Sequence, residues 1–62
     1  MAPEQVDRKI LKVLEKQDMT IEEVAKEIGM HRITVSKYLA VLEARGEVTY
    51  RQIGKAKLYS LK

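Results

Sequence analysis

Residues 20–46 read TIEEVAKEIGMHRITVSKYLAVLEARG, a stretch that predicts two helices joined by a tight turn. Thr20 begins the first helix, because its hydroxyl can accept from the N–H of Glu23 while the Glu23 carboxylate accepts from the N–H of Thr20. Gly29 is suited to the left-handed C-cap of that helix, since it has no β-carbon. The buried stripe of this helix, over about 20–28, is expected to be Ile21, Val24, Ala25 and Ile28.

A second helix is predicted over about residues 31–45. His31 takes its N-cap position, where histidine is not a preferred residue. Gly46 is expected at its C-cap, and Arg45 in the last turn favours the negative end of the helix dipole. Apolar residues recur at helical spacing and predict its core face: Val35, Leu39 and Leu42.

The flanking segments add one helix before this unit and a hairpin after it. A helix over about 3–17 has Pro3 in its first turn, with Glu4 and Asp7 near the positive end of its dipole. Its predicted apolar face is Val6, Ile10, Val13 and Leu14. Residues 47–53 and 57–61 alternate as strands do, around a turn at 54–56. The chain is therefore predicted to be mainly α with a small β-hairpin, in the order α-α-α-β-β.

Alternation along the two strands assigns a face to each side chain. The core-facing positions are predicted to be Val48, Tyr50, Tyr59 and Leu61. The outward positions are predicted to be Thr49, Arg51, Leu58 and Ser60. Ile53 and Leu58 are expected near each other at the tip of the hairpin, where packing against the domain is favoured over contact with a partner.

Composition excludes several classes of protein. The 62 residues include no cysteine and one histidine, which leaves no disulfide framework and no cysteine or histidine cluster for a metal. The chain shows no paired nucleophile and base and no glycine-rich phosphate loop. We therefore expect no enzyme activity, no metal, no cofactor and no small-molecule substrate. Without a signal peptide or an apolar span, we expect a soluble cytoplasmic protein that does not enter a membrane.

The charge is distributed unevenly along the chain. Residues 1–30 carry five Lys and Arg against seven Asp and Glu, whereas residues 31–62 carry seven Lys and Arg against two Glu. A basic C-terminal half favours a polyanionic partner, with nucleic acid the first candidate and an anionic membrane surface the second. The competing interpretation is a solvated surface with an accidental asymmetry.

Three residues at two fixed spacings carry a family resemblance. Ala25 allows two helices to approach, Gly29 four residues later makes a turn, and Val35 six residues further docks the second helix. With Gly46 and the hairpin that follows, nearly the whole chain resembles a winged helix-turn-helix DNA-binding domain. The likeness is greatest to the arsenic-resistance and multiple-antibiotic-resistance types of bacterial and archaeal repressor (ArsR-like and MarR-like).

The resemblance implies one domain over residues 1–62, with a recognition helix at about 31–45 and a wing at about 47–61. It also implies that this protein is a prokaryotic transcriptional regulator that binds double-stranded DNA with this helix in the major groove. Repressors of these types have additional helices for dimerisation. None is evident in this sequence, so a homodimer and a larger parent protein both stay open.

The helix at 31–45 offers small and hydrogen-bonding side chains on the face opposite its core. Arg32 and Lys37 can donate to guanine or to phosphate, and Arg32 alone offers a bidentate fork. Thr34 and Ser36 can reach base edges or phosphate oxygens. The apolar candidates for thymine methyl contact are Ile33 and Ala40, and His31 is assigned to capping or to phosphate.

In the wing, Arg51, Lys55 and Lys57 surround the turn at Gly54 and suit contact with phosphate or with the minor groove. They also suit the protection of an edge strand by lysine, and both interpretations hold together. Tyr38 lies at the edge of the core face, where a structural use is favoured over a phosphate contact.

The same fold is compatible with two other functions. One is a module for protein–protein interaction, whose apolar contacts would be Ile33, Val41, Ile53 and Leu58. The other is binding of left-handed DNA by the vertebrate type of winged domain, which uses an Asn–Tyr pair in its third helix and a wing Trp with prolines. This sequence has no Asn, no Trp and no Pro after Pro3, so that function is disfavoured.

Overall fold

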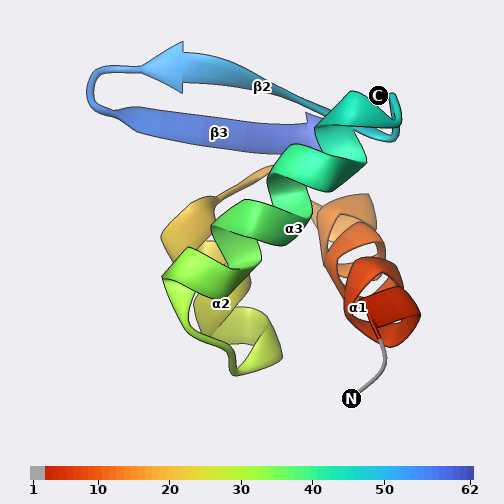
Figure 1. The fold of residues 1–62 in the computed structure, drawn as a ribbon. Coiled ribbons are helices and arrows are strands. Elements are labelled where there is room, and N and C mark those ends of the chain that lie inside the picture. Colours follow the sequence, from red (N-terminus) through yellow and green to blue (C-terminus); the bar gives the residue numbers. More distant parts are fainter. Residues whose placement is uncertain (1–2) are drawn as a thin grey trace.

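The computed structural model describes the backbone of residues 3–62 and the side chains of residues 5–62. Three helices and three strands follow one another in the order α1, β1, α2, α3, β2, β3 (Figure 1). The roles predicted for the side chains of Pro3 and Glu4 lie outside the described residues. The bounds of the elements are α1 Pro3–Lys16, β1 Met19–Thr20, α2 Ile21–Ile28, α3 Arg32–Ala44, β2 Val48–Ile53 and β3 Ala56–Leu61.

The turn between α2 and α3 is fixed by hydrogen bonds at both helix ends. At the start of α2 the predicted capping box is present, with Glu23 N donating to Thr20 Oγ1 and Thr20 N donating to Glu23 Oε1. Gly29 follows α2 in the left-handed conformation at φ 73°, and its N–H donates to the Ala25 carbonyl. His31 is the N-cap of α3, as predicted, and its Nδ1 accepts from Ile33 N at 3.2 Å.

The C-terminal end of α3 differs from the prediction by one residue. Arg45 is the C-cap in a right-handed conformation, and Gly46 lies one position beyond it at φ 79°. The positive φ at Gly46 redirects the chain into β2, which is the usual place for glycine after a helix. The Gly46 N–H donates to the Glu43 carbonyl and the Glu47 N–H to the Leu42 carbonyl.

All three helices and the sheet contribute to one core. Ile10 of α1, Val24 of α2 and Leu39 of α3 are fully buried, and Val48 of β2 and Tyr59 of β3 close the core from the sheet side. Among residues 5–62 the buried hydrophobic residues are Val6, Ile10, Leu14, Met19, Val24, Ala25, Val35, Leu39, Leu42, Val48 and Tyr59. In a chain of this length such a core supplies only modest stability, so caps and turns count.

The sheet has three strands, whereas a two-stranded hairpin was predicted. β1 pairs antiparallel with β3, with Met19 opposite Tyr59 and Thr20 opposite Leu58, so the strand order is β1-β3-β2. The prediction missed β1 because two residues carry no periodicity and their partners lie about forty positions later. β1 also covers the edge of β3, so that Leu58, predicted to face outward, is half-buried.

Other expectations for the hairpin are corrected in detail. The turn consists of Gly54 and Lys55 alone, because Ala56 already belongs to β3. Ile53 pairs with Ala56 and Leu58 pairs with Arg51, so the two apolar side chains are not cross-strand partners. Ser60 is half-buried rather than outward, and Leu61, predicted to face the core, is 37% exposed at the open end of the hairpin.

An ion-pair network joins the C-terminal end of α3 to α1. The Nη1 of Arg45 donates to Asp7 Oδ2 at 3.0 Å and to Glu47 Oε2 at 3.4 Å. Asp7 is the least exposed of the three side chains, at 14%, and its other oxygen, Oδ1, is buried without a hydrogen-bond partner among the described residues. The position of Arg45 therefore has a tertiary cause in addition to the helix dipole. No described helix has the length and apolarity that crossing a membrane requires.

Candidate nucleic-acid interface

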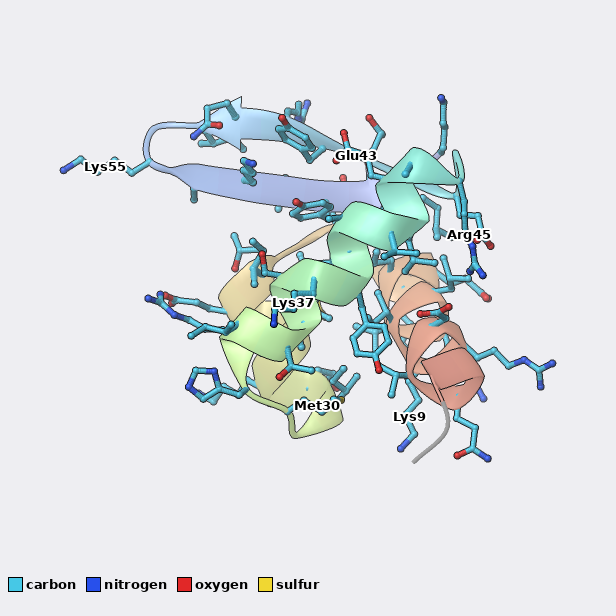
Figure 2. All side chains as sticks on the ribbon, in the orientation of Figure 1. Lys9, Met30, Lys37, Glu43, Arg45 and Lys55 are labelled. Carbon is cyan, nitrogen blue, oxygen red and sulfur yellow. The ribbon has the colours of Figure 1, made fainter. Side chains whose placement is uncertain are left out.

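α3 presents a face of exposed side chains opposite the face that it buries. Val35, Leu39 and Leu42 are fully buried, as their spacing predicts. The side chains on the opposite face are exposed, and they are Ile33, Lys37, Ala40 and Ala44. Figure 2 shows Lys37 extending from this outward face, and Lys55 extending from the turn between β2 and β3.

The outward face of α3 forms one wall of an open groove of about 860 Å³. The other walls are the start of α2 and the distal half of the hairpin, which projects on the side of the N-terminal end of α3 (Figure 1). The residues that line this groove are Thr20, Ile21, Glu22, Arg32, Ile33, Ser36, Lys37, Gln52, Ile53, Lys55, Ala56 and Lys57. We refer to it as the helix–wing groove.

The helix–wing groove brings together six of the ten predicted DNA-binding residues. Four come from α3 and two from the wing: Arg32, Ile33, Ser36, Lys37, Lys55 and Lys57. Because the two groups are about twenty residues apart in the chain, their proximity depends on how the hairpin returns over α3. A ligand in the groove would contact both elements at once.

The other four predicted residues lie outside the groove. The imidazole of His31 is occupied as the cap of α3, and Thr34 is half-buried. Ala40 is exposed one turn beyond Lys37. Arg51 is opposite Leu58 in the hairpin, and strand alternation directs it to the sheet face that Tyr50 and Tyr59 do not share.

The charged groups of the groove are four cations and one carboxylate: Arg32, Lys37, Lys55, Lys57 and Glu22. This excess makes the groove attractive to a polyanion, and the low-dielectric walls concentrate the field there. Two of the cations have fixed neighbours. Arg32 Nη1 donates to Glu22 Oε1 at 3.0 Å, and Lys57 Nζ lies 4.6 Å from the centre of the Tyr50 ring.

Sequence reasoning missed several groove residues. Glu22 and Gln52 were given no role, although both line the groove. Ile21 packs partly against the core, as predicted, and also lines the groove. Ile53 was expected to pack on the domain, yet it is 53% exposed in the groove wall. Gln52 bends toward the turn, where its Nε2 donates to the Gly54 carbonyl at 3.1 Å.

Solved structures of known proteins share this fold. A DNA-binding domain from Mycobacterium bovis, described as homodimeric and as a possible ArsR-family transcriptional regulator, is 28% identical with a TM-score of 0.88. The transcriptional regulator HlyU from Vibrio vulnificus is also 28% identical, with a TM-score of 0.86. This chain aligns over 92% and 90% of its own length with these two, but spans only 53% and 58% of theirs.

A third similar structure matches over its entire length. The Zalpha domain of PKZ from Carassius auratus, solved in complex with Z-DNA, is 28% identical with a TM-score of 0.93, and the alignment covers 100% of both chains. No curated protein matches the chain in sequence. The fold of this chain is therefore that of a winged helix-turn-helix, common to all three structures.

A family model identifies the protein family of this chain. The model of the arsR family of bacterial regulatory proteins matches residues 6–50, from α1 through α3 into β2. This segment is well over half of the 62 residues and includes the capping box, the Gly29 turn and the outward face of α3. The fold and the matched family are those of DNA-binding transcription regulators rather than enzymes. The chain belongs to the arsR family of bacterial regulatory proteins.

Proposed function

We propose that this protein binds double-stranded DNA in transcription regulation, with α3 in the major groove and the wing on the backbone or in the minor groove. The observation that carries the proposal is the helix–wing groove, which Arg32 and Lys37 of α3 line together with Lys55 and Lys57 of the wing. The major groove of B-DNA admits one helix, and a flanking hairpin then meets the adjacent phosphates.

The groove residues divide by what they can contact. Arg32, Ile33, Ser36 and Lys37 project from the first two turns of α3, and we assign base-edge contacts to them. Lys55 and Lys57 on the hairpin are assigned to phosphate, which positions a protein on DNA without reading sequence. We keep Arg51 as a contact to phosphate or the minor groove and His31 as a contact to phosphate. We keep Thr34 as a contact to a base edge or phosphate and Ala40 as an apolar contact.

We further propose that the protein acts in the cytoplasm of a prokaryote, as its bacterial relatives favour. The chain spans little more than half of those relatives, so we propose that residues 1–62 are the DNA-binding unit, either of a homodimer or of a larger protein. The relative from Mycobacterium bovis is described as homodimeric. A two-fold dimer of this chain would select a palindromic site.

The test is an NMR titration of the isotope-labelled protein with a duplex of random sequence, at low salt and at higher salt. We expect amide shifts in residues 31–40 and 51–57, and we expect them to fade as salt rises, because bound cations return to the phosphates. A Lys55→Ala variant should shift less, whereas Lys26→Ala, on an exposed face of α2 outside the groove, should behave as the wild type. Unmoved amides at low salt would contradict the proposal.

The alternative is a winged-helix module that binds a protein. It is favoured by three apolar side chains that are at least half exposed: Ile33 at 58%, Val41 at 50% and Ile53 at 53%. Salt separates the two functions, since an apolar contact with a protein weakens little as ionic strength rises. Binding to a protein partner that persists in high salt and is lost in an Ile33→Asp variant would favour this alternative.

Left-handed DNA is a second alternative, favoured by the full-length match to the Zalpha domain that was solved with Z-DNA. The aromatic and proline pattern that marks those winged domains is missing here, since the chain has no Asn, no Trp and no Pro after Pro3. Circular dichroism of an alternating CG duplex discriminates directly. Inversion of the DNA spectrum on adding the protein would support left-handed binding, and an unchanged B-form spectrum is our expectation.

A further inference from the structure

Glu22 is out of place electrostatically in the helix–wing groove. It is the one acid among the residues that line the groove, and a carboxylate there repels the phosphates of an approaching duplex. The Glu22 and Arg32 side chains are 73% and 65% exposed, so their ion pair adds little to the stability of the fold. The capping of α2 does not need it, because Glu23 performs that task. A role in binding is the explanation that remains.

The atom that Glu22 holds is informative. Within the described part of the chain, Arg32 makes its ion pair through Nη1, with Glu22 Oε1 at 3.0 Å. A guanidinium has five N–H donors in a rigid plane, and Nε and Nη2 present two parallel donors on the edge that Nη1 does not share. Holding Nη1 therefore restrains the orientation of the group and leaves this two-donor edge available.

The two-donor edge matches one base. In the major groove guanine presents O6 and N7 as two adjacent acceptors, and a bidentate arginine is the commonest specific contact to them. Phosphate also accepts two hydrogen bonds from arginine, but the Glu22 carboxylate beside Arg32 repels it. An oriented guanidinium next to a carboxylate therefore favours the base over the backbone.

We propose that Glu22 is a positioning residue that orients Arg32 to read a guanine at one position of the target site. This inference rests on the proposed function, since it concerns how the same groove selects DNA. Glu22 contributes twice, because it restrains the guanidinium through Nη1 and disfavours phosphate near Arg32. Without Glu22, Arg32 becomes a mobile cation that contacts any nearby phosphate.

The experiment begins by selecting bound duplexes from a random pool with the wild-type protein. Each guanine of the selected site is then replaced in turn by 7-deazaguanine, which keeps base pairing but removes the N7 acceptor. Dissociation constants are measured for the wild type and for Arg32→Ala, Glu22→Ala and Glu27→Ala. Glu27→Ala is the matched control, since Glu27 is an exposed acid of α2 that does not line the groove.

For the wild type we expect one guanine whose replacement weakens binding about tenfold, within the range of a bidentate contact. Arg32→Ala should abolish that effect and Glu22→Ala should reduce it to about twofold, which is the loss of most of that discrimination. Glu22→Ala should also bind random duplexes more tightly than the wild type. Glu27→Ala should keep the full tenfold effect.

Three results would overturn the inference while leaving DNA binding intact. In the first, replacing the guanine weakens binding by Glu22→Ala as much as it weakens binding by the wild type. In the second, Glu22→Ala and Glu27→Ala change the dissociation constant of every duplex equally. In the third, no 7-deazaguanine replacement weakens binding by the wild type. A parallel loss of affinity for all duplexes in Glu22→Ala would assign it a structural role instead. If the wild type bound no duplex at all, the proposed function itself would fail.

Discussion

The ammonium group of Lys57 lies 4.6 Å from the centre of the Tyr50 ring, on the side of the hairpin that faces the groove. Tyr50 in turn packs against the buried Tyr59, with 5.4 Å between the ring centroids. The two tyrosines are cross-strand partners, and Lys57 is two residues before Tyr59 on the same face of β3. A groove cation is thus connected to the core through two aromatic rings.

Replacing Tyr50 tests this connection. Tyr50→Leu should lower the free energy of unfolding by about 1–2 kcal/mol, because an aromatic pair and a cation–π contact are both lost. Tyr50→Phe keeps both rings and should stay within about 0.5 kcal/mol of the wild type, since only a hydroxyl is removed. Urea denaturation monitored by circular dichroism measures the difference. Equal destabilisation by the two variants would show that the ring contacts contribute nothing.

The cap of α3 offers a second prediction. His31 Nδ1 accepts from Ile33 N at 3.2 Å, and histidine is a poor substitute for the usual capping residues. We expect the free energy of unfolding of the His31→Ser variant to exceed that of the His31→Ala variant by about 1 kcal/mol, because serine is a preferred N-cap residue and alanine is not. Their thermal midpoints provide the measurement. Identical midpoints would mean that a side-chain acceptor at position 31 for the N–H of Ile33 does not stabilise the protein.

Tyr59 predicts a dependence of stability on alkaline pH. Burial raises the pKa of Tyr59 above its ordinary 10.0, and the nearby Glu43 and Tyr50 raise it further. The folded state therefore holds the phenolic proton more tightly than the unfolded state does. The associated stability is present below pH 10 and is lost as pH rises from about 10 through the folded pKa.

Unfolding by urea between pH 8 and 11 checks this sign. The free energy of unfolding should fall more steeply above pH 10 for the wild type than for Tyr59→Phe, which has no phenolic proton at that position. Tyr38→Phe is the matched control for the loss of a tyrosine hydroxyl. A Tyr59→Phe variant with the wild-type slope would assign the alkaline loss to other groups.

Variants of the groove cations distinguish side chains that contact bases from side chains that contact phosphates. Arg32→Ala and Lys37→Ala should weaken binding to a selected duplex more than to random DNA, since each good base contact is worth about 1–3 kcal/mol of discrimination. Lys55→Ala should weaken all duplexes alike and reduce the salt slope by about 0.9, the value for one lost phosphate contact. Fluorescence anisotropy over a range of salt measures both quantities, with Lys26→Ala as control. Unchanged specific affinity in both α3 variants would remove the recognition-helix assignment.

Local signals in the sequence were sufficient for the helices. Thr20 and Glu23 form a capping box with each other, and Gly29 needs only its own backbone freedom. The buried faces of α1, α2 and α3 follow from 3.6-residue periodicity, since a helix buries one stripe whatever it packs against. The end of α3 was misplaced by one residue, because a glycine at positive φ follows the C-cap of a helix rather than occupying it, and Arg45 is the C-cap here.

The sheet was predictable only in part. Alternation identified β2 and β3 and the inward positions of Val48 and Tyr59. It could not identify β1 or the burial of Leu58, because both depend on Met19 and Thr20 meeting residues 58 and 59. Position at the end of the sheet decided Leu61, which alternation assigned to the core and which is 37% exposed.

The candidate site shows the same division. The chemistry of its residues was evident from their type, and six of the ten predicted contacts line the helix–wing groove. The sequence by itself determined the three helices, the hairpin, the turn at Gly29 and the family, because these depend on hydrogen bonds and periodicities within a few residues. The return of the wing over α3 and the pairing of Glu22 with Arg32 were decided by the tertiary structure alone. Both join groups that are ten or more residues apart, and only the packing of the common core places such groups in contact.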